Sequence, residues 1–213
     1  MKYFLALLLA TTVLHAQDLS PADTTALLAS FAEQRKGAAM QVDFREEKHL
    51  ALMQKPVIET GTLAFLPPDK FRREVKGKSL TVCDGTTLWL YYPEFNEAEK
   101  YLLASNRALR ESLSAMTSGI GLQDIAKNYA VQAQKRADGY QITLTPKNSS
   151  LRKSVSQIRL TISEALVAKR MEILGAQGDN IITTFSNEQK ANLTPGDFKF
   201  QPPKDVTISE PLK

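Results

Sequence analysis

Hydrophobic and polar residues alternate along most of the chain, which predicts a protein built mainly of β-strands. Met40, Val42 and Phe44 have polar neighbours on both sides, the pattern of a strand with one buried face. Turn-forming residues, for example Asp84-Gly85, separate further strand-like runs at short intervals. We expect these further strands over residues 57–66, 70–76, 79–83, 87–92, 98–103, 129–135, 140–145, 155–163, 168–174, 181–186 and 206–208.

Two stretches have helical periodicity instead. Ser20 precedes Pro21 and an acidic first turn, which predicts a helix that is capped by Ser20 and ends at Gly37. Between two blocks of strands, Leu109, Leu113 and Met116 recur at spacings of four and three residues, which predicts a helical insert. This order predicts one α+β domain, in which the insert covers one face of a curved antiparallel sheet.

Some of the predicted strands are apolar on both faces, notably residues 63–66 and 88–92. A sheet with one solvated face would alternate more regularly. One face could therefore pack on a helix while the other lines a dry, apolar hollow. A sandwich core that is covered on both sides explains the pattern equally well, so the periodicity leaves both interpretations open.

The N-terminus has the layout of a secretory signal peptide. Lys2 is followed by an apolar run over residues 4–14, and Ala16 offers a small residue for cleavage. The run is too short to span a bilayer, which takes about 20 apolar residues. We expect residues 1–16 to be a signal peptide cleaved near Ala16, and residues 17–213 to be a single exported domain released in soluble form; the alternative is an N-terminal anchor.

Composition and motifs argue against several other classes of protein. The 27 basic and 23 acidic residues give a net charge of only +4 and are evenly scattered, so we expect no nucleic-acid partner. Cys83 is the only cysteine, so an internal disulfide is impossible. After the signal peptide the only histidine is His49, in a charged strand end that we expect to be solvated, and Glu46 and Glu47 should point to opposite faces. We therefore expect no enzymatic activity, no cofactor and no metal.

Four segments, in order along the chain, carry a family resemblance. The first is Gly61-Thr62-Leu63-Ala64-Phe65 with Pro68 and Phe71, and the second is the run from Asp84 to Pro93. Residues 140–147 and 198–206 supply the other two. Together with the predicted signal peptide and insert, this arrangement resembles the periplasmic outer-membrane lipoprotein carriers, the LolA family.

The resemblance implies an open, unclosed β-barrel whose apolar concave face is covered by a helical lid. It also implies a monomeric carrier that takes an acylated lipoprotein from an inner-membrane transporter and passes it to an outer-membrane acceptor. Phe71, Leu63 and Phe65 match apolar positions of the concave wall, and Trp89 matches the family's tryptophan. Trp89 and its neighbours Leu88 and Leu90 have opposite parity, so only one set can face the hollow. The candidate cargo-binding residues are Leu63, Phe65, Phe71 and Trp89 of the sheet and Leu109, Leu113 and Met116 of the insert, and plain core packing is the alternative for each.

One position departs from the family pattern. Pro67 stands where family members usually have an arginine that latches the lid by hydrogen bonds. Proline has no side-chain donor. This departure opens a second interpretation, a relative that serves another amphiphile, such as a glycolipid or polyene lipid, or a different transporter. A periplasmic domain that uses the same scaffold to bind a protein is a third.

Overall fold

The structure is a computed structural model that describes residues 17–106, 109 and 125–211. Within these ranges thirteen strands form a single sheet in the order β1-β8-β9-β10-β11-β12-β2-β3-β4-β5-β6-β7-β13. These neighbouring strands are antiparallel except β13, which pairs with β7 in parallel. The strands are β1 (Gln17–Asp18), β2 (Ala39–His49), β3 (Val57–Leu66), β4 (Lys70–Val75), β5 (Ser79–Cys83), β6 (Thr87–Tyr92), β7 (Glu97–Leu102), β8 (Tyr129–Arg136), β9 (Gly139–Pro146), β10 (Val155–Ser163), β11 (Ala168–Gly175), β12 (Asn180–Ala191) and β13 (Thr207–Ser209).

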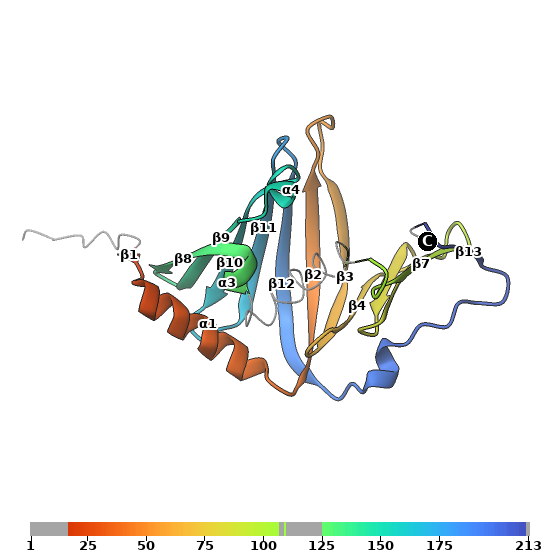
Figure 1. Ribbon diagram of the computed structural model, residues 1–213, viewed down its shortest axis with the longest axis horizontal. Coiled ribbons are helices and arrows are strands. Elements are labelled where there is room, and N and C mark those ends of the chain that lie inside the picture. The colour runs from red at the N-terminus through yellow and green to blue at the C-terminus, as the bar shows by residue number, and fades with distance from the viewer. Residues whose placement is uncertain (1–16, 107–108, 110–124, 212–213) are drawn as a thin grey trace, which may run out of the picture.

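The sheet is open, because its edge strands β1 and β13 lie at opposite ends of the strand order. Figure 1 shows the two halves of the sheet on either side of the long central strands β12 and β2. The prediction of an α+β fold around an unclosed antiparallel sheet is therefore confirmed. The helices are α1 (Pro21–Arg35), α3 (Ile125–Asn128), α4 (Ser149–Arg152) and the 3-10 helix η1 (Pro195–Phe198). No helix in the described ranges is long and apolar enough to cross a membrane.

Helix α1 begins where its sequence predicts. The Ser20 hydroxyl accepts a hydrogen bond from the Asp23 N–H at 3.1 Å, and Pro21 takes the first helical position, where no N–H is needed. Leu27 and Phe31 of α1 pack with Ile125 of α3 against the half of the sheet made by β8 to β11 (Figure 1). This cluster forms the main hydrophobic core. Its sheet residues are Tyr129, Ala133, Ile142, Leu144, Leu160 and Ile162.

A buried ion pair holds the end of α1 against the sheet. Arg35 pairs with Glu188 of β12, and their side chains are only 4% and 9% exposed. Arg35 also donates to the Leu166 carbonyl at 2.8 Å, and its guanidinium stacks 3.6 Å above the Phe31 ring. Glu188 in turn accepts the Ala168 N–H at 2.9 Å. Burial lowers the pKa of Arg35, but the charge and hydrogen bond of Glu188 oppose this shift.

We call the side of the sheet on which α1 and α3 pack the inner face, and the opposite side the outer face. The strand registers carry the inner face across the centre of the sheet. Leu160 of the main core lies opposite both Ile142 and Met171, and Met171 lies opposite Thr183. Two residues further along β12, Phe185 lies opposite Phe44 of β2. Because directly paired residues point to the same side, these residues all belong to the inner face.

Candidate functional site

Strand register aligns the apolar residues of the family-like segments into one row. Phe65 of β3 lies opposite Phe71 of β4, Phe71 lies opposite Cys83 of β5, and Cys83 lies opposite Leu88 of β6. Phe65 also pairs with Met40, which shares the parity of Phe44 on β2. The row therefore belongs to the inner face.

This row is the centre of a second apolar cluster. Phe65, Phe71, Cys83 and Leu88 are 3%, 6%, 2% and 4% exposed and pack together with Leu103. Three half-buried residues pack against the cluster: Leu90, Tyr101 and Leu109. The described part of the inner face therefore has an apolar cluster in each half of the sheet.

The candidate residues of the sheet divide between the two faces. Leu63, Phe65 and Phe71 lie on the inner face, where Leu63 is half-buried between Val42 and Arg73. Leu109 of the insert packs against the same cluster. Leu113 and Met116 lie outside the described residues, as does the rest of the predicted lid.

Trp89 lies on the outer face. It pairs with Val82 and Lys100, whereas its neighbours Leu88 and Leu90 belong to the inner face. Its ring meets that of Phe200 edge-on, with centroids 5.6 Å apart. The structure thus answers the parity question that the sequence left open: Leu88 and Leu90 lie on the same side as Phe71, and Trp89 is separated from them by the sheet.

Charged side chains occupy the inner face between the two apolar clusters, toward the β2–β3 loop. Arg73 lies 3.0 Å from Glu46 and 3.5 Å from Glu59, and Lys48 lies 2.8 Å from Glu59. The carboxylates are shielded, with side chains 14% and 16% exposed. The Thr183 hydroxyl donates to Glu46 at 3.3 Å. We call Glu46, Lys48, Glu59, Arg73 and Thr183 the polar cluster.

The polar cluster balances its own charges. The hydrogen bond from Lys48 is the main cause of a lowered pKa at Glu59; burial opposes it, and the charges of Lys48 and Arg73 reinforce it. Arg73 also stacks 4.5 Å above the Phe44 ring, which joins the polar cluster to the apolar part of the face. Sequence reasoning missed this cluster, although one signal was present. Glu46 and Lys48 have the same strand parity as Met40, Val42 and Phe44.

Nucleophilic chemistry finds no support in the geometry. His49 lies on the outer face at the end of β2, its side chain is 44% exposed, and it lies 3.5 Å from Glu47. Cys83 is buried on the inner face, and burial raises the pKa of its thiol, which disfavours the reactive thiolate. Asp84 caps a hairpin turn by accepting the Thr86 and Thr87 N–H groups, each at 2.8 Å. Among the described residues no group of three or more acids, histidines or cysteines could hold a metal ion.

Two clefts open elsewhere on the described part of the molecule. One, of about 280 Å³, lies on the outer face between β2, β3, β4 and η1, and includes Arg72 and Phe198 in its walls. The other, of about 430 Å³, lies beside α1 and includes Leu27 and Tyr140. Neither is lined by the candidate cargo-binding residues, so the predicted apolar hollow stays a prediction.

Comparisons with known proteins agree with the motifs and the sheet. The family profile described as "Outer membrane lipoprotein carrier protein LolA" matches residues 35–201. Outer-membrane lipoprotein carrier proteins of Chromobacterium violaceum and Xylella fastidiosa are each 29% identical, over 153 and 155 residues. Each alignment covers 70% of this chain, and it covers 71% and 70% of the respective relative.

A solved structure supports the fold alone. An uncharacterized conserved protein from Thermus thermophilus superimposes with a TM-score of 0.53 at 14% sequence identity, and the match covers 87% of this chain and 98% of that protein. The family profile spans most of the chain, including every strand from β2 to β12. The chain therefore belongs to the LolA family of outer-membrane lipoprotein carriers.

Proposed function

We propose that this protein is a periplasmic carrier that holds the acyl chains of lipoproteins against the inner face of its sheet. The observation that carries the proposal is the continuity of that face. Half-buried apolar residues connect the two apolar clusters across the centre of the sheet. They are Met40, Val42, Leu63, Leu90, Met171, Ile173, Ile181 and Phe185.

The energetics of lipid burial explain why such a face is needed. Each buried CH₂ group of an acyl chain gains about 0.8 kcal/mol, so a cargo with two or three chains does not travel free in water. A broad surface of aliphatic and aromatic side chains accepts chains of different length, because it has few directional contacts. Leu63, Leu90 and Phe185 provide surface of this kind.

The polar cluster complements an amphiphilic cargo. An acylated lipoprotein has a polar linkage and a peptide next to its chains. Arg73 lies beside the apolar residues Phe44 and Leu63, and Lys48 lies opposite Ile181, so both could face that polar part while hydrocarbon occupies the rest of the face. Their carboxylate partners keep the cluster neutral enough to remain partly buried without cargo.

The finer features of the carrier are part of the same proposal. We propose that residues 1–16 are removed during export, that an inner-membrane transporter delivers the cargo and that an outer-membrane acceptor receives it. The helical insert that contains Leu113 and Met116 would shield bound chains from water. Pro67 is compatible with one alternative, a carrier of a different amphiphile: the resemblance implies an arginine there that latches the lid, and proline has no side-chain donor.

Neighbouring residues of β3 offer a matched test of the inner face. Leu63 is half-buried on the inner face, and Thr62 is exposed on the outer face. We expect Leu63→Asp to lower uptake of an acylated lipoprotein by about tenfold or more, because an acyl chain would desolvate the carboxylate. The mutant should still fold, since Arg73 lies opposite position 63 as a partner. Leu63→Met and Thr62→Asn should keep uptake near the wild-type level.

Uptake is measured by mass spectrometry of the protein after incubation with acylated lipoprotein or, separately, with phospholipid and glycolipid extracts. Retention of the lipoprotein supports the proposed cargo. If the protein retains a glycolipid or another lipid but no lipoprotein, the cargo is the alternative amphiphile. If it retains neither lipoprotein nor lipid, a protein-binding scaffold is favoured. Undiminished uptake by a folded Leu63→Asp variant would remove the inner face from the mechanism.

A further inference from the structure

The loop between β2 and β3 exposes an unusual amount of apolar surface. Figure 1 shows this hairpin projecting beyond the rest of the sheet. Leu52 is 99% exposed, Met53 51%, Ile58 47% and Leu50 36%. Single exposed apolar residues are common on protein surfaces, but several together mark a contact site. We call Leu50, Leu52, Met53 and Ile58 the apolar tip.

The apolar tip is held in its projecting position by hydrogen bonds. The Met53 N–H donates to the Leu50 carbonyl at 2.9 Å and closes the turn. The Ala51 N–H donates to the Asp179 carboxylate at 2.8 Å, which joins the tip to the β11–β12 turn. The β2–β3 ladder continues as far as the pair Lys48 and Val57. The exposed side chains are therefore presented by a supported turn.

Three exposed cations lie near the apolar tip. Residues 49–58 contain the exposed cation Lys55 and no acidic residue. The β11–β12 turn also bonds to the segment before β10, through the Ala176 N–H and the Ser154 carbonyl at 3.0 Å. This contact brings the exposed cations Arg152 and Lys153 to the same end of the sheet.

Two carboxylates also lie at this end of the sheet. Asp179 accepts the Ala51 N–H, and Glu47 pairs with Arg45 and with His49. An apolar projection with exposed cations beside it matches the boundary of an anionic bilayer, where apolar side chains enter the acyl region and cations stay among the phosphates.

We propose that the apolar tip is a membrane-contact site that inserts Leu52 and Met53 into the surface of anionic phospholipid bilayers. The small number of inserted side chains makes the contact weak and reversible, as suits a protein that leaves one membrane for another. The site is separate from the inner face and does not depend on the identity of the cargo. Its failure would therefore leave the proposed carrier function untouched.

Cosedimentation with vesicles tests the proposal without any cargo. The protein is recovered after export and its N-terminus is verified, because an uncleaved apolar run at residues 4–14 would itself bind lipid. We expect binding to vesicles of phosphatidylcholine with phosphatidylglycerol, and weaker binding to phosphatidylcholine alone. Leu52→Ser should weaken binding by about tenfold or more, since it removes one large inserted side chain.

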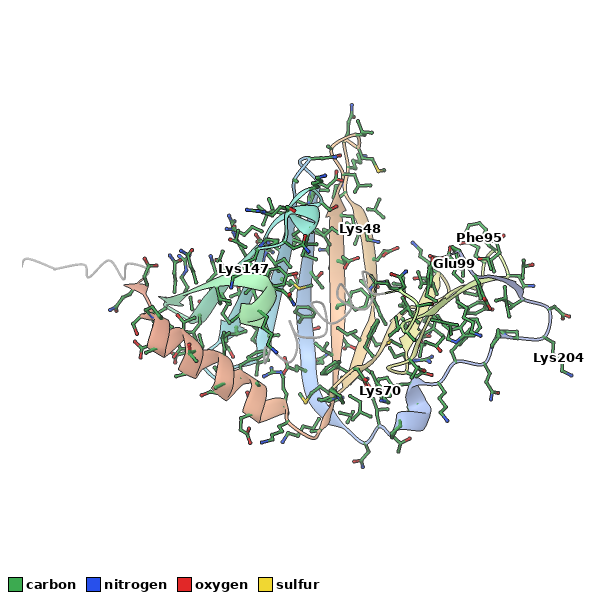
Figure 2. All side chains as sticks on the ribbon, in the orientation of Figure 1. Lys48, Lys70, Phe95, Glu99, Lys147 and Lys204 are labelled. Atoms are coloured by element: carbon green, nitrogen blue, oxygen red, sulfur yellow. The ribbon has the colours of Figure 1, made fainter. Side chains whose placement is uncertain are left out.

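A matched control comes from an exposed aromatic residue elsewhere on the surface. Phe95 is 69% exposed in the β6–β7 turn, away from the apolar tip (Figure 2), and Phe95→Ser should leave binding unchanged. Lys153→Gln should weaken binding only to the anionic vesicles. Because Cys83 is buried, Gln54→Cys adds an accessible thiol at the tip for an environment-sensitive dye, whose emission should rise on contact with the vesicles.

Three results would overturn the membrane-contact site. The first is no binding of the wild type to either kind of vesicle, even if the tip proves to contact a protein. The second is binding that Leu52→Ser leaves intact. The third is equal loss of binding in Leu52→Ser and Phe95→Ser.

Discussion

Single residues of this protein owe their roles to the neighbours that the sheet gives them. Gly61 is an example, because a side chain there would have no space: an added Cβ would lie 1.9 Å from the Glu74 carbonyl oxygen and 2.9 Å from the Phe44 ring. Because Gly61 has no side chain, the Glu74 carbonyl and the Phe44 ring, over which Arg73 stacks, can both approach the backbone there. Asp84 is a second example, since its carboxylate organises a turn.

Asp84 predicts a pH dependence of stability. Partial burial would raise the pKa of its carboxyl, but hydrogen bonds from the Thr87 and Thr86 N–H groups and the Thr86 hydroxyl outweigh it and lower the pKa. A lowered folded-state pKa stabilises the protein above the unfolded value of about 3.9, and this stabilisation is lost as the pH falls through the folded-state value. The stability difference between wild type and Asp84→Asn should therefore shrink below about pH 4.

Urea unfolding at a series of pH values measures this difference. Thr86→Val removes only the hydroxyl donor, so its effect should be smaller and should fade over the same pH range. A difference between wild type and Asp84→Asn that stays constant from neutral to acidic pH would show that the charge of Asp84 does not stabilise the turn.

At the scale of elements, the two faces of the sheet are covered by different parts of the chain. Helices α1 and α3 cover the inner face of β8 to β11, and the C-terminal segment covers the outer face of β4 and β6. Within that segment Phe198 is fully buried, and Phe200 lies against both Trp89 and Tyr91. The family-like segment at residues 198–206 thus has a packing role on the face opposite Phe71.

We expect Phe198→Ala to destabilise the fold by about 3–5 kcal/mol, because it leaves a cavity the size of an aromatic ring. Lys199 is exposed on the same segment, and Lys199→Ala should change stability by about 0.5 kcal/mol or less. Denaturant unfolding compares the two variants. A loss below about 1 kcal/mol for Phe198→Ala would mean that the segment is not firmly packed on the sheet.

At the scale of the whole molecule, the sheet is open and is covered by different segments on its two sides. The chain belongs to a family of carriers, so the expectation that it is not an enzyme is confirmed. The apolar surface of the inner face and the projecting tip are separate regions. One could hold cargo while the other touches a membrane.

The single tryptophan reports which face the cargo uses. Trp89 lies on the outer face against Phe200, so cargo with brominated acyl chains should quench its fluorescence only weakly. Leu90→Trp in a Trp89→Phe background places the indole on the inner face, where the same cargo should quench it strongly. Strong quenching of Trp89 in the wild type, with none at position 90, would place the cargo on the outer face.

The sequence alone determined most of the elements. Strands β3, β5, β6 and β10 have the predicted bounds, and α1 begins at its predicted cap, because alternation, turns and capping residues act over a few neighbouring positions. Local patterns missed β1, α4 and η1, which are two to four residues long, and the full length of β2 and β12. Strand β1, helix η1 and the ends of β2 and β12 depend on distant strands, whereas α4 packs on its sequence neighbours β9 and β10.

Only the tertiary structure decided which residues lie on the inner face of the sheet and which lie on the outer face. In the strand that contains Leu88 to Tyr92 both parities are apolar, so periodicity could not tell which one faces inward. The register with β5 and the packing of Phe200 from the far end of the chain assigned Leu88 to the inner face and Trp89 to the outer one. The polar cluster likewise arises from four strands that meet only in the folded sheet, because ion pairs between residues 46, 59 and 73 are set by register and not by spacing in the sequence.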